Sequence, residues 1–118
     1  MKSLKIVSAV LLFLLVRPAR AFTAPVKGLA SWYGKTHQGK RMANGQPFDR
    51  TKFTAASKTL PLGSRVKVTC LKTGKSILVT ITDRGPYVGR RILDLSEAAA
   101  KAIGLKSYGV TMVSINAN

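Results

Sequence analysis

The sequence predicts a mainly β protein, a compact barrel of short strands with one small helix. Alternating apolar residues indicate two neighbouring strands, at residues 65–71 and 77–82, joined by a short turn. A helix is indicated at residues 97–103, where Ser96 is placed to cap the first turn and Gly104 to end the helix. Short strands around one small helix are typical of a compact barrel.

The remaining elements follow in chain order. Residues 22–27 are expected to form a lead-in, and residues 29–33 the first strand. Residues 35–54 form a long polar loop region with room for a strand of its own, and long loops on a small barrel are where function usually lies. Residues 91–95 and 110–115 are predicted to be the last two strands.

The first 21 residues have the three parts of a secretory signal peptide. Two lysines precede an almost unbroken apolar stretch at residues 6–16, which is too short to span a bilayer, and a small-x-small motif at residues 19–21 supplies a cleavage site. We therefore expect cleavage after Ala21 and a mature protein that is secreted or periplasmic. No cysteine stands next to the apolar stretch, since the single cysteine is Cys70, so neither a lipid anchor nor a transmembrane segment is expected in the mature chain.

Composition narrows the class of partner. The signal peptide carries four basic residues and no acid, so its removal lowers the formal charge from +16 to +12 and leaves enough chain for one small domain, residues 28–118. A surface this basic favours a polyanion. Export favours an anionic polymer of the cell envelope over nucleic acid, and peptidoglycan carries such carboxylates. We expect a monomer that binds peptidoglycan glycan strands and no nucleic acid.

The single cysteine, Cys70, cannot form an internal disulfide, so the fold must depend on its core. Cys70 alternates with Val66 and Val68, which predicts a buried strand residue, with a reactive thiol as the alternative.

The mature chain has four acidic side chains, and each has a structural interpretation beside a chemical one. Asp49 lies in a polar loop, where Asp commonly caps a turn. Asp83 precedes a Gly-Pro turn that it could hold, or it could pair with Arg84. Asp94 has apolar neighbours, so burial would raise its pKa, although the following helix would lower it. Glu97 is expected to be a solvated charge in the first helical turn.

Ordered motifs along the mature chain resemble those of the rare lipoprotein A family. The motifs are ASWYG at residues 30–34, MANGQPFD at 42–49, TAASKTLPLG at 54–63, TDRGPY at 82–87 and GRRILDLS at 89–96. The resemblance covers nearly all of the mature chain. It implies a six-stranded double-psi β-barrel, similar to barwin and to the first domain of expansins, over residues 28–115. It also implies endolytic lytic transglycosylation of peptidoglycan, with a preference for glycan strands stripped of stem peptides.

That reaction needs one group that first gives and then takes a proton. A carboxylic acid protonates the glycosidic oxygen between N-acetylmuramic acid and N-acetylglucosamine, and the carboxylate then takes the proton of the muramyl C6 hydroxyl as the 1,6-anhydro ring closes. A hydrolase normally needs two spaced carboxylates. A chain with few acids fits the first chemistry more easily. The resemblance makes Asp49, Asp83 and Asp94 the catalytic candidates, with Asp49 or Asp94 as the acid and base.

Neutral and basic side chains near these motifs are the candidates for binding the sugar. They are Trp32, Tyr33, Asn44, Gln46, Ser57 and Arg84. Core packing is the alternative for the two aromatic residues, and shaping a tight turn is the alternative for Asn44. His37 is expected to be a loop residue, and no His or Cys cluster offers a metal site, so neither a metal nor another cofactor is expected.

Several positions depart from the family pattern. The usual Glu is replaced by Gln46, which cannot transfer a proton, and the usual His residues are replaced by Ser57 and Gln38. These departures favour the alternative function, a non-catalytic, expansin-like barrel that binds glycan. The three retained Asp motifs favour the enzyme. An exported basic domain that binds a protein partner is a third class, with no motif behind it.

The enzyme hypothesis makes one geometric prediction. Asp49, Asp83 and Asp94 should approach a single groove, lined by Trp32 or Tyr33 together with Asn44 and Gln46.

Overall fold

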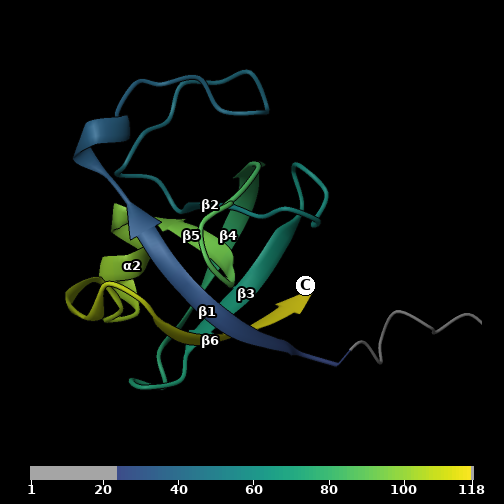
Figure 1. The fold of residues 1–118 in the computed structure, drawn as a ribbon, viewed down its shortest axis with the longest axis vertical. Helices are drawn as coiled ribbons and strands as arrows, with labels where there is room; N and C mark the ends of the chain where they lie inside the picture. Colours follow the sequence, from purple (N-terminus) through teal and green to yellow (C-terminus); the bar gives the residue numbers. More distant parts are fainter. Residues whose placement is uncertain (1–23, 118) are drawn as a thin grey trace, which may run out of the picture.

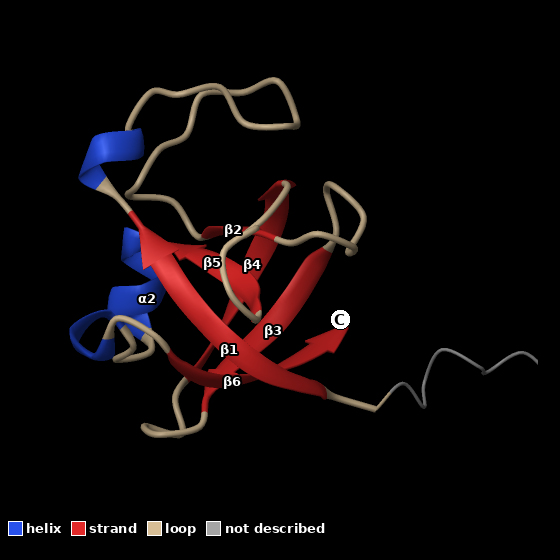
Figure 2. Cartoon of the chain, viewed as in Figure 1, coloured by secondary structure: helices blue, strands red, loops and turns tan. Residues whose placement is uncertain are grey.

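Six strands and one α-helix make up the fold in the computed structural model, which describes residues 24–117 (Figures 1 and 2). The predicted signal peptide, residues 1–21, lies outside the described residues. The strands are β1 (Val26–Tyr33), β2 (Thr54–Ala56), β3 (Arg65–Cys70), β4 (Ser76–Asp83), β5 (Arg91–Ser96) and β6 (Thr111–Ala117). The helices are α2 (Glu97–Ala102) and two 3-10 turns, η2 (Lys35–His37) and η3 (Lys106–Tyr108). No helix in this part of the chain is long and apolar enough to cross a membrane.

The strands close into a barrel in the order β1-β5-β2-β4-β3-β6. Two pairs are parallel, β1 with β5 and β2 with β4, whereas β2 with β5 and both neighbours of β6 are antiparallel. This closed, mixed arrangement is the double-psi barrel that the resemblance implied. All six strands and the buried core cluster come from residues 26–117.

The predicted hairpin of β3 and β4 is confirmed. Val66 pairs with Val79 and Val68 with Ile77, and the apolar residues of β3 are buried in alternation with exposed ones. Cys70 is fully buried at the end of this row, as its alternation predicted. The hairpin therefore contributes one apolar face to the core and one polar face to solvent.

Helix α2 packs one face on the barrel. The Ser96 hydroxyl accepts a hydrogen bond from the Ala99 N–H at 3.2 Å, so the predicted cap is confirmed. Ala99, Ala100 and Ile103 are fully buried, although the helix itself ends at Ala102. The chain then turns at Gly104, whose φ of +73° suits a residue without a side chain.

Strands β1 and β2 differ most from the prediction, and the other elements differ by one or two residues at their ends. Strand β1 begins at Val26, inside the predicted lead-in, because its first residues pair with β6 although they are exposed. Strand β2 falls at the end of the polar loop region and has three residues, too few for an apolar pattern to reveal it. Both strands are defined by partners distant in the sequence and not by a local pattern.

The long loop between η2 and β2 folds over one end of the barrel, at the top of Figure 1. Phe48 and Met42 are buried and anchor it. The turn that joins β3 to β4 lies at the opposite end, at the bottom of Figure 1. The two ends of the barrel therefore differ, one with long loops and the other with short turns.

Candidate active site

Two of the three candidate aspartates flank strand β2 near the loop-covered end. Ala56 of β2 pairs with Asp94 of β5 on one side and with Asp83 of β4 on the other. Neighbouring strands lie about 4.8 Å apart, so the Cα atoms of the two aspartates are roughly 10 Å apart. Only the small side chain of Ala56 lies on the strand between them. We call this place the acidic rim, defined by Asp83 and Asp94.

Asp94 is held in a half-buried position by strand β1. Ser31 pairs with Asp94 in the parallel ladder, and its hydroxyl donates a 2.9 Å hydrogen bond to the Asp94 carboxylate. Burial raises the pKa of Asp94, and the negative charge of Asp83 raises it further. The Ser31 hydrogen bond and the charges of Arg91 and His37 oppose this increase without cancelling it. Asp94 therefore keeps its proton to a higher pH than an exposed aspartate, as a general acid requires.

Asp83 connects the barrel to the long loop. One carboxylate oxygen accepts hydrogen bonds from the backbone N–H groups of Ala43 and Arg84, both at 2.9 Å. The Arg84 guanidinium donates to the carbonyl oxygens of Ser57 and Leu60, at 2.9 and 2.6 Å. Asp83 thus holds its own turn, as one interpretation of the sequence proposed, and also presents a carboxylate beside Asp94.

Tyr33 projects from the same face of β1 as Ser31, which lies two residues earlier. Its ring stacks on Phe48, with centroids 4.5 Å apart, and contacts the edge of His37 at 5.2 Å. Its hydroxyl is buried and has no hydrogen-bond partner within the described residues. Burial, followed by the negative charges of Asp83 and Asp94, raises the pKa of Tyr33. The hydroxyl stays protonated and is a hydrogen-bond donor beneath the surface of the rim.

Trp32 faces the helix side of β1. Its indole N–H donates to the Lys106 carbonyl at 3.1 Å, the Lys106 ammonium lies 5.2 Å from the ring centroid, and the ring packs against the core. This is the core-packing role that the sequence left open. Residues 32–37 also border an open hollow of about 340 Å³, so Trp32 and Tyr33 both reach its wall.

The loop residues Asn44 and Gln46 form a tight turn over the rim. The Asn44 side chain accepts a 2.9 Å hydrogen bond from the Gln46 N–H, and Gly45 between them has φ of +89°. The Asn44 N–H donates to the Thr82 carbonyl at 3.1 Å, next to Asp83. Both side chains are exposed, so the turn presents two amides at the edge of the acidic rim.

The structure places Asp49 in a different environment. Its carboxylate accepts the Thr51 N–H at 2.9 Å and the Thr51 hydroxyl at 2.7 Å. These hydrogen bonds, assisted by the charge of Lys52, lower the pKa of Asp49, the opposite of the shift at Asp94. The geometry of Asp49 is that of a residue that caps a turn.

The structure buries Ser57, another candidate for binding the sugar. The residue is 2% exposed, and its hydroxyl accepts the N–H groups of Thr59 and Leu60 at 3.2 and 3.0 Å. Ser57 shapes the loop that Arg84 binds, underneath the surface.

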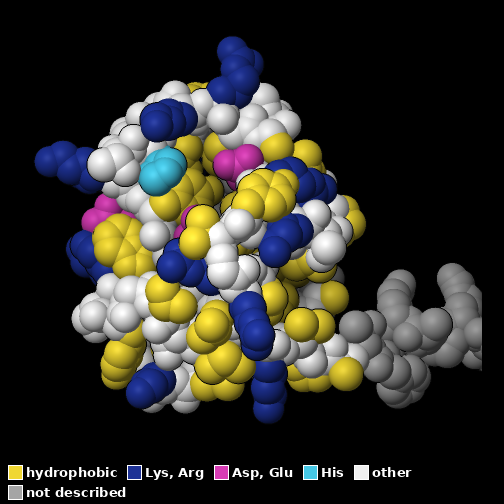
Figure 3. Space-filling view, in the orientation of Figure 1, with side chains coloured by type: hydrophobic (Ala, Val, Ile, Leu, Met, Phe, Trp, Pro, Cys, Tyr) yellow, Lys and Arg dark blue, Asp and Glu magenta, His cyan; other side chains and the backbone are white. Residues whose placement is uncertain are grey.

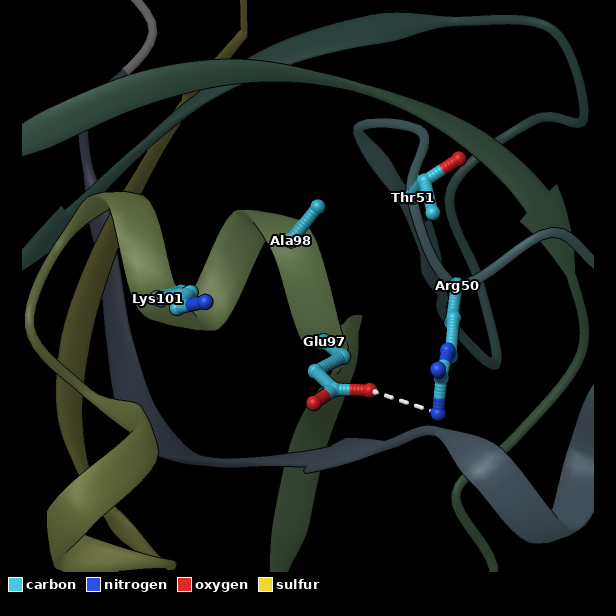
Figure 4. A pocket seen from close by; sticks show the side chains of 5 residues that line it. All are labelled: Arg50, Thr51, Glu97, Ala98 and Lys101. Carbon is cyan, nitrogen blue, oxygen red and sulfur yellow. Dashed lines mark ion pairs between the residues drawn. The ribbon is translucent and has the colours of Figure 1, made fainter.

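Glu97, predicted to be a solvated charge, is instead ion-paired beside a second hollow. It contacts the Lys106 ammonium at 2.7 Å and the Arg50 guanidinium at 3.7 Å, and its side chain is 22% exposed. The hydrogen bond and charge of Lys106 lower the pKa of Glu97. The hollow, about 260 Å³, is lined by Arg50, Thr51, Glu97, Ala98 and Lys101 (Figure 4). It lies against α2, and neither aspartate of the acidic rim lines it.

Three residues at the rim were not singled out from the sequence. Ser31 and Arg91 act on Asp94. Arg91 precedes it by three residues on β5, whereas Ser31 is 63 residues earlier and reaches Asp94 only through the pairing of β1 with β5. Tyr87 is 74% exposed in the loop after Asp83, and an exposed aromatic ring in a motif is the signal that could have identified it. Figure 3 shows acidic side chains next to the single histidine on this face. Within residues 24–117, no three His, Cys, Asp or Glu side chains are arranged to hold a metal.

A sequence profile described as lytic transglycolase matches residues 25–115. The chain is 53% identical over 89 residues to the "Probable endolytic peptidoglycan transglycosylase RlpA" of Synechocystis sp., which covers 75% of this chain and 28% of the relative. It is 48% identical over 88 residues to the "Endolytic peptidoglycan transglycosylase RlpA" of Neisseria meningitidis, covering 75% and 37%. The matched segment therefore corresponds to about a third of the length of these relatives.

A solved structure shares the fold at low sequence identity. A mutant of the Clavibacter michiganensis expansin, crystallised in complex with cellohexaose, superposes with a TM-score of 0.62 and 19% identity, covering 80% of this chain and 50% of that one. At this identity the likeness is one of fold, and it agrees with the closed barrel described above.

Proposed function

The chain belongs to the lytic transglycolase family, and from that premise we propose that it is an exported enzyme that cleaves the glycan strands of peptidoglycan. The bond cleaved is that between N-acetylmuramic acid and N-acetylglucosamine, within the strand, and the product is a 1,6-anhydro end. The relatives named above carry the name of this activity.

The observation that carries the proposal is the environment of Asp94. Its carboxyl is half-buried, its pKa is raised, and a second carboxylate, Asp83, lies across a single narrow strand. A carboxyl that keeps its proton in this way is suited to protonate a leaving oxygen. Among the four acids of the mature chain, Asp49 and Glu97 have lowered pKa values, which do not suit that step.

In the proposed reaction one proton leaves Asp94 and another returns to it. Asp94 protonates the glycosidic oxygen as the bond to the muramyl C1 breaks, and the sugar develops positive charge. The resulting carboxylate then accepts the proton of the C6 hydroxyl, whose oxygen bonds to C1. Water takes no part, and the carboxyl ends the cycle protonated.

The other rim residues have supporting roles in this proposal. The negative charge of Asp83 raises the pKa of Asp94 and favours the developing positive charge on the sugar. The exposed amides of Asn44 and Gln46 donate hydrogen bonds to sugar oxygens. The exposed ring of Tyr87 stacks on a sugar face.

The N-terminal segment and the net charge support a location and a partner. Residues 1–21 have the composition of a signal peptide, and the formal charge of +12 after cleavage favours a polyanionic wall polymer. We infer that the mature protein works as a monomer outside the cytoplasm on peptidoglycan.

The test is product analysis by mass spectrometry. The protein comprising residues 22–118, which contains the whole barrel, is incubated with glycan strands freed of stem peptides. Anhydro-ended fragments are expected from the unaltered protein and from Asp49→Asn, and none from Asp94→Asn. Fragments that disappear in Asp49→Asn but persist in Asp94→Asn would show that Asp49, in the long loop, is the general acid.

Binding without cleavage is the second candidate function, and two observations favour it. Gln46 offers an amide where the family pattern has a carboxylic acid, and Ser57 is buried and occupied with backbone. If the protein sediments with glycan in a salt-dependent way and produces no new ends, the barrel is a binding module. Loss of that sedimentation in Tyr87→Ala would then place the glycan at the acidic rim.

A further inference from the structure

The end of the barrel opposite the acidic rim exposes large apolar side chains on two loop tips. Leu71 starts the turn between β3 and β4 and is 45% exposed. Tyr108 ends η3 and is 50% exposed, Val110 lies between η3 and β6 and is 39% exposed, and Met112 is 39% exposed at the start of β6. Single exposed apolar residues are common on protein surfaces, but four on two adjacent segments, residues 71–75 and 106–112, form a patch.

Contacts join the two loops into one surface. The Leu71 N–H donates to the Met112 carbonyl at 3.1 Å. These two residues therefore lie opposite each other on the outer face of the β3–β6 pair. The Thr73 hydroxyl donates to the Ile103 carbonyl at 2.7 Å, and the Lys72 ammonium lies 5.5 Å from the centroid of the Tyr108 ring. The turn and the loop are thus fixed side by side.

Charge on this surface has a single sign. Lys72 and Lys75 are exposed on the turn, and residues 71–75 and 104–112 contain no acid. Figure 3 likewise shows hydrophobic and basic side chains together on the lower part of this face, with acidic side chains higher up. We call this surface the loop-tip surface, defined by Leu71, Lys72, Lys75, Tyr108, Val110 and Met112.

We propose that the loop-tip surface docks on an anionic lipid bilayer. Aliphatic and aromatic side chains at the tips of loops enter the headgroup region, where tyrosine is favoured, while neighbouring lysines bind lipid phosphates. The absence of acids from both loops means that no repulsion opposes this contact.

A bilayer fits this surface better than a glycan or a protein groove. The four apolar side chains are exposed on a turn, on η3 and the segment after it, and at the start of β6, which suits insertion into a soft interface. A sugar chain is bound by hydrogen-bonding side chains, such as the exposed amides at the acidic rim. An anionic protein would also contact the lysines, and vesicle binding distinguishes a bilayer from it.

Docking of this kind would fix the direction in which the acidic rim faces. Strand β4 runs from the loop-tip turn at Ser76 to the rim at Asp83, and eight strand residues span about 26 Å. A protein held by the loop-tip surface therefore presents the rim away from the lipid. The inference goes beyond the proposed glycan cleavage and holds independently of it.

The experiment is flotation of the protein comprising residues 22–118 with vesicles. Vesicles of phosphatidylglycerol and phosphatidylcholine are compared with vesicles of phosphatidylcholine alone. The double variant Leu71→Ser/Tyr108→Ser removes an exposed aliphatic and an exposed aromatic residue from the loop-tip surface. The matched control, Tyr87→Ser/Val88→Ser, removes the same types at the opposite end, where these residues are 74% and 62% exposed.

We expect the unaltered protein and the control to float with anionic vesicles. The loop-tip variant should bind more weakly by roughly tenfold or more, because two large side chains no longer leave water. Lys72→Gln/Lys75→Gln should weaken binding by about twentyfivefold, at about fivefold for each lysine. Neutral vesicles should bind little of any form.

A second readout is independent of affinity. Tyr108→Trp should show fluorescence that shifts to the blue and is quenched by brominated lipid, whereas Tyr87→Trp should show neither beyond the background of Trp32. The proposal fails if the unaltered protein stays unbound to anionic vesicles, or if both double variants weaken binding equally. It also fails if the loop-tip variant binds anionic vesicles as tightly as the unaltered protein does.

Discussion

Asp94 near the end of β5 and Glu97 at the start of α2 lie three residues apart, and their pKa values are shifted in opposite directions. Asp94 is half-buried against Ser31 and its pKa is raised, whereas Glu97 is paired with Lys106 and Arg50 and its pKa is lowered. The chain changes from strand to helix between them, which turns one side chain toward the rim and the other toward a cationic cluster. Position in the fold, and not the type of side chain, decides which acid is available for chemistry.

The largest expected effect separates the two acids by activity. Asp94→Asn should lower the rate of glycan cleavage by about 10²- to 10⁴-fold, because an amide cannot transfer a proton. Glu97→Gln should leave the rate nearly unchanged. Initial rates of formation of anhydro ends measure both. Equal losses in the two variants would mean that Asp94 and Glu97 do not differ in their role in cleavage.

The next largest effect is on stability, and it concerns Ser96, which joins β5 to α2. Ser96 is fully buried, and its hydroxyl donates to the Lys52 carbonyl at 2.6 Å while it accepts the Ala99 N–H. Ser96→Ala should lower the free energy of unfolding by about 1–3 kcal/mol, because both backbone groups lose a partner. Denaturation in urea measures it, with the exposed Ser107→Ala as the control. A change as small as that of the control would mean that water replaces the hydroxyl.

Two substitutions next to Asp94 should shift the pH dependence of cleavage in opposite directions. Activity should fall as the pH rises through the raised pKa of Asp94, because the protonated form starts the reaction. Arg91→Gln removes a positive charge that lowers this pKa, so the alkaline limb should move to higher pH. Asp83→Asn removes a negative charge that raises the pKa, so the limb should move to lower pH.

The profile to record is kcat/KM against pH for both variants. Displacement of the two limbs in the same direction would show that a group other than Asp94 titrates.

The smallest expected effect is on stability, and it has opposite signs at the two acids. The folded state raises the pKa of Asp94, so ionisation of Asp94 opposes folding, and Asp94→Asn should stabilise the protein at pH 7. The folded state lowers the pKa of Glu97, so its charge supports folding above the ordinary pKa of a glutamate, and Glu97→Gln should destabilise at pH 7.

Both differences should vanish at a pH below all of these pKa values, where both carboxyls are protonated in either state. Urea denaturation at pH 7 and at low pH provides the comparison. A destabilised Asp94→Asn at neutral pH would mean that the ionised carboxyl is favoured by its surroundings.

Local sequence patterns predicted the parts of the fold that depend on near neighbours. The alternation in β3 and β4 predicted their pairing and the burial of Cys70, and Ser96 before an Ala-rich stretch predicted the helix cap. These patterns did not predict the three-residue strand β2, because it is defined by its partners β4 and β5, which lie far along the chain.

The acidic rim was predictable only in part, because local patterns indicated the burial of Asp94 but not the distant residue that contacts it. Apolar neighbours of Asp94 predicted its burial, yet the hydroxyl that binds it comes from Ser31, 63 residues earlier. For Asp49 a family motif indicated chemistry, while the local Asp-x-Thr sequence forms the turn that the structure shows. Side chains brought together by parallel strands leave no trace in local spacing.

The pairing of β1 with β6 ties the beginning of the domain to its end. Val26 lies opposite Ile115, so the barrel stays open until the last strand has been synthesised. Contacts this distant in sequence slow folding, because the loop must close before they stabilise it. The chain therefore cannot complete its barrel before β6 has been synthesised. A polypeptide that has not closed such a barrel can still be threaded through a narrow membrane channel.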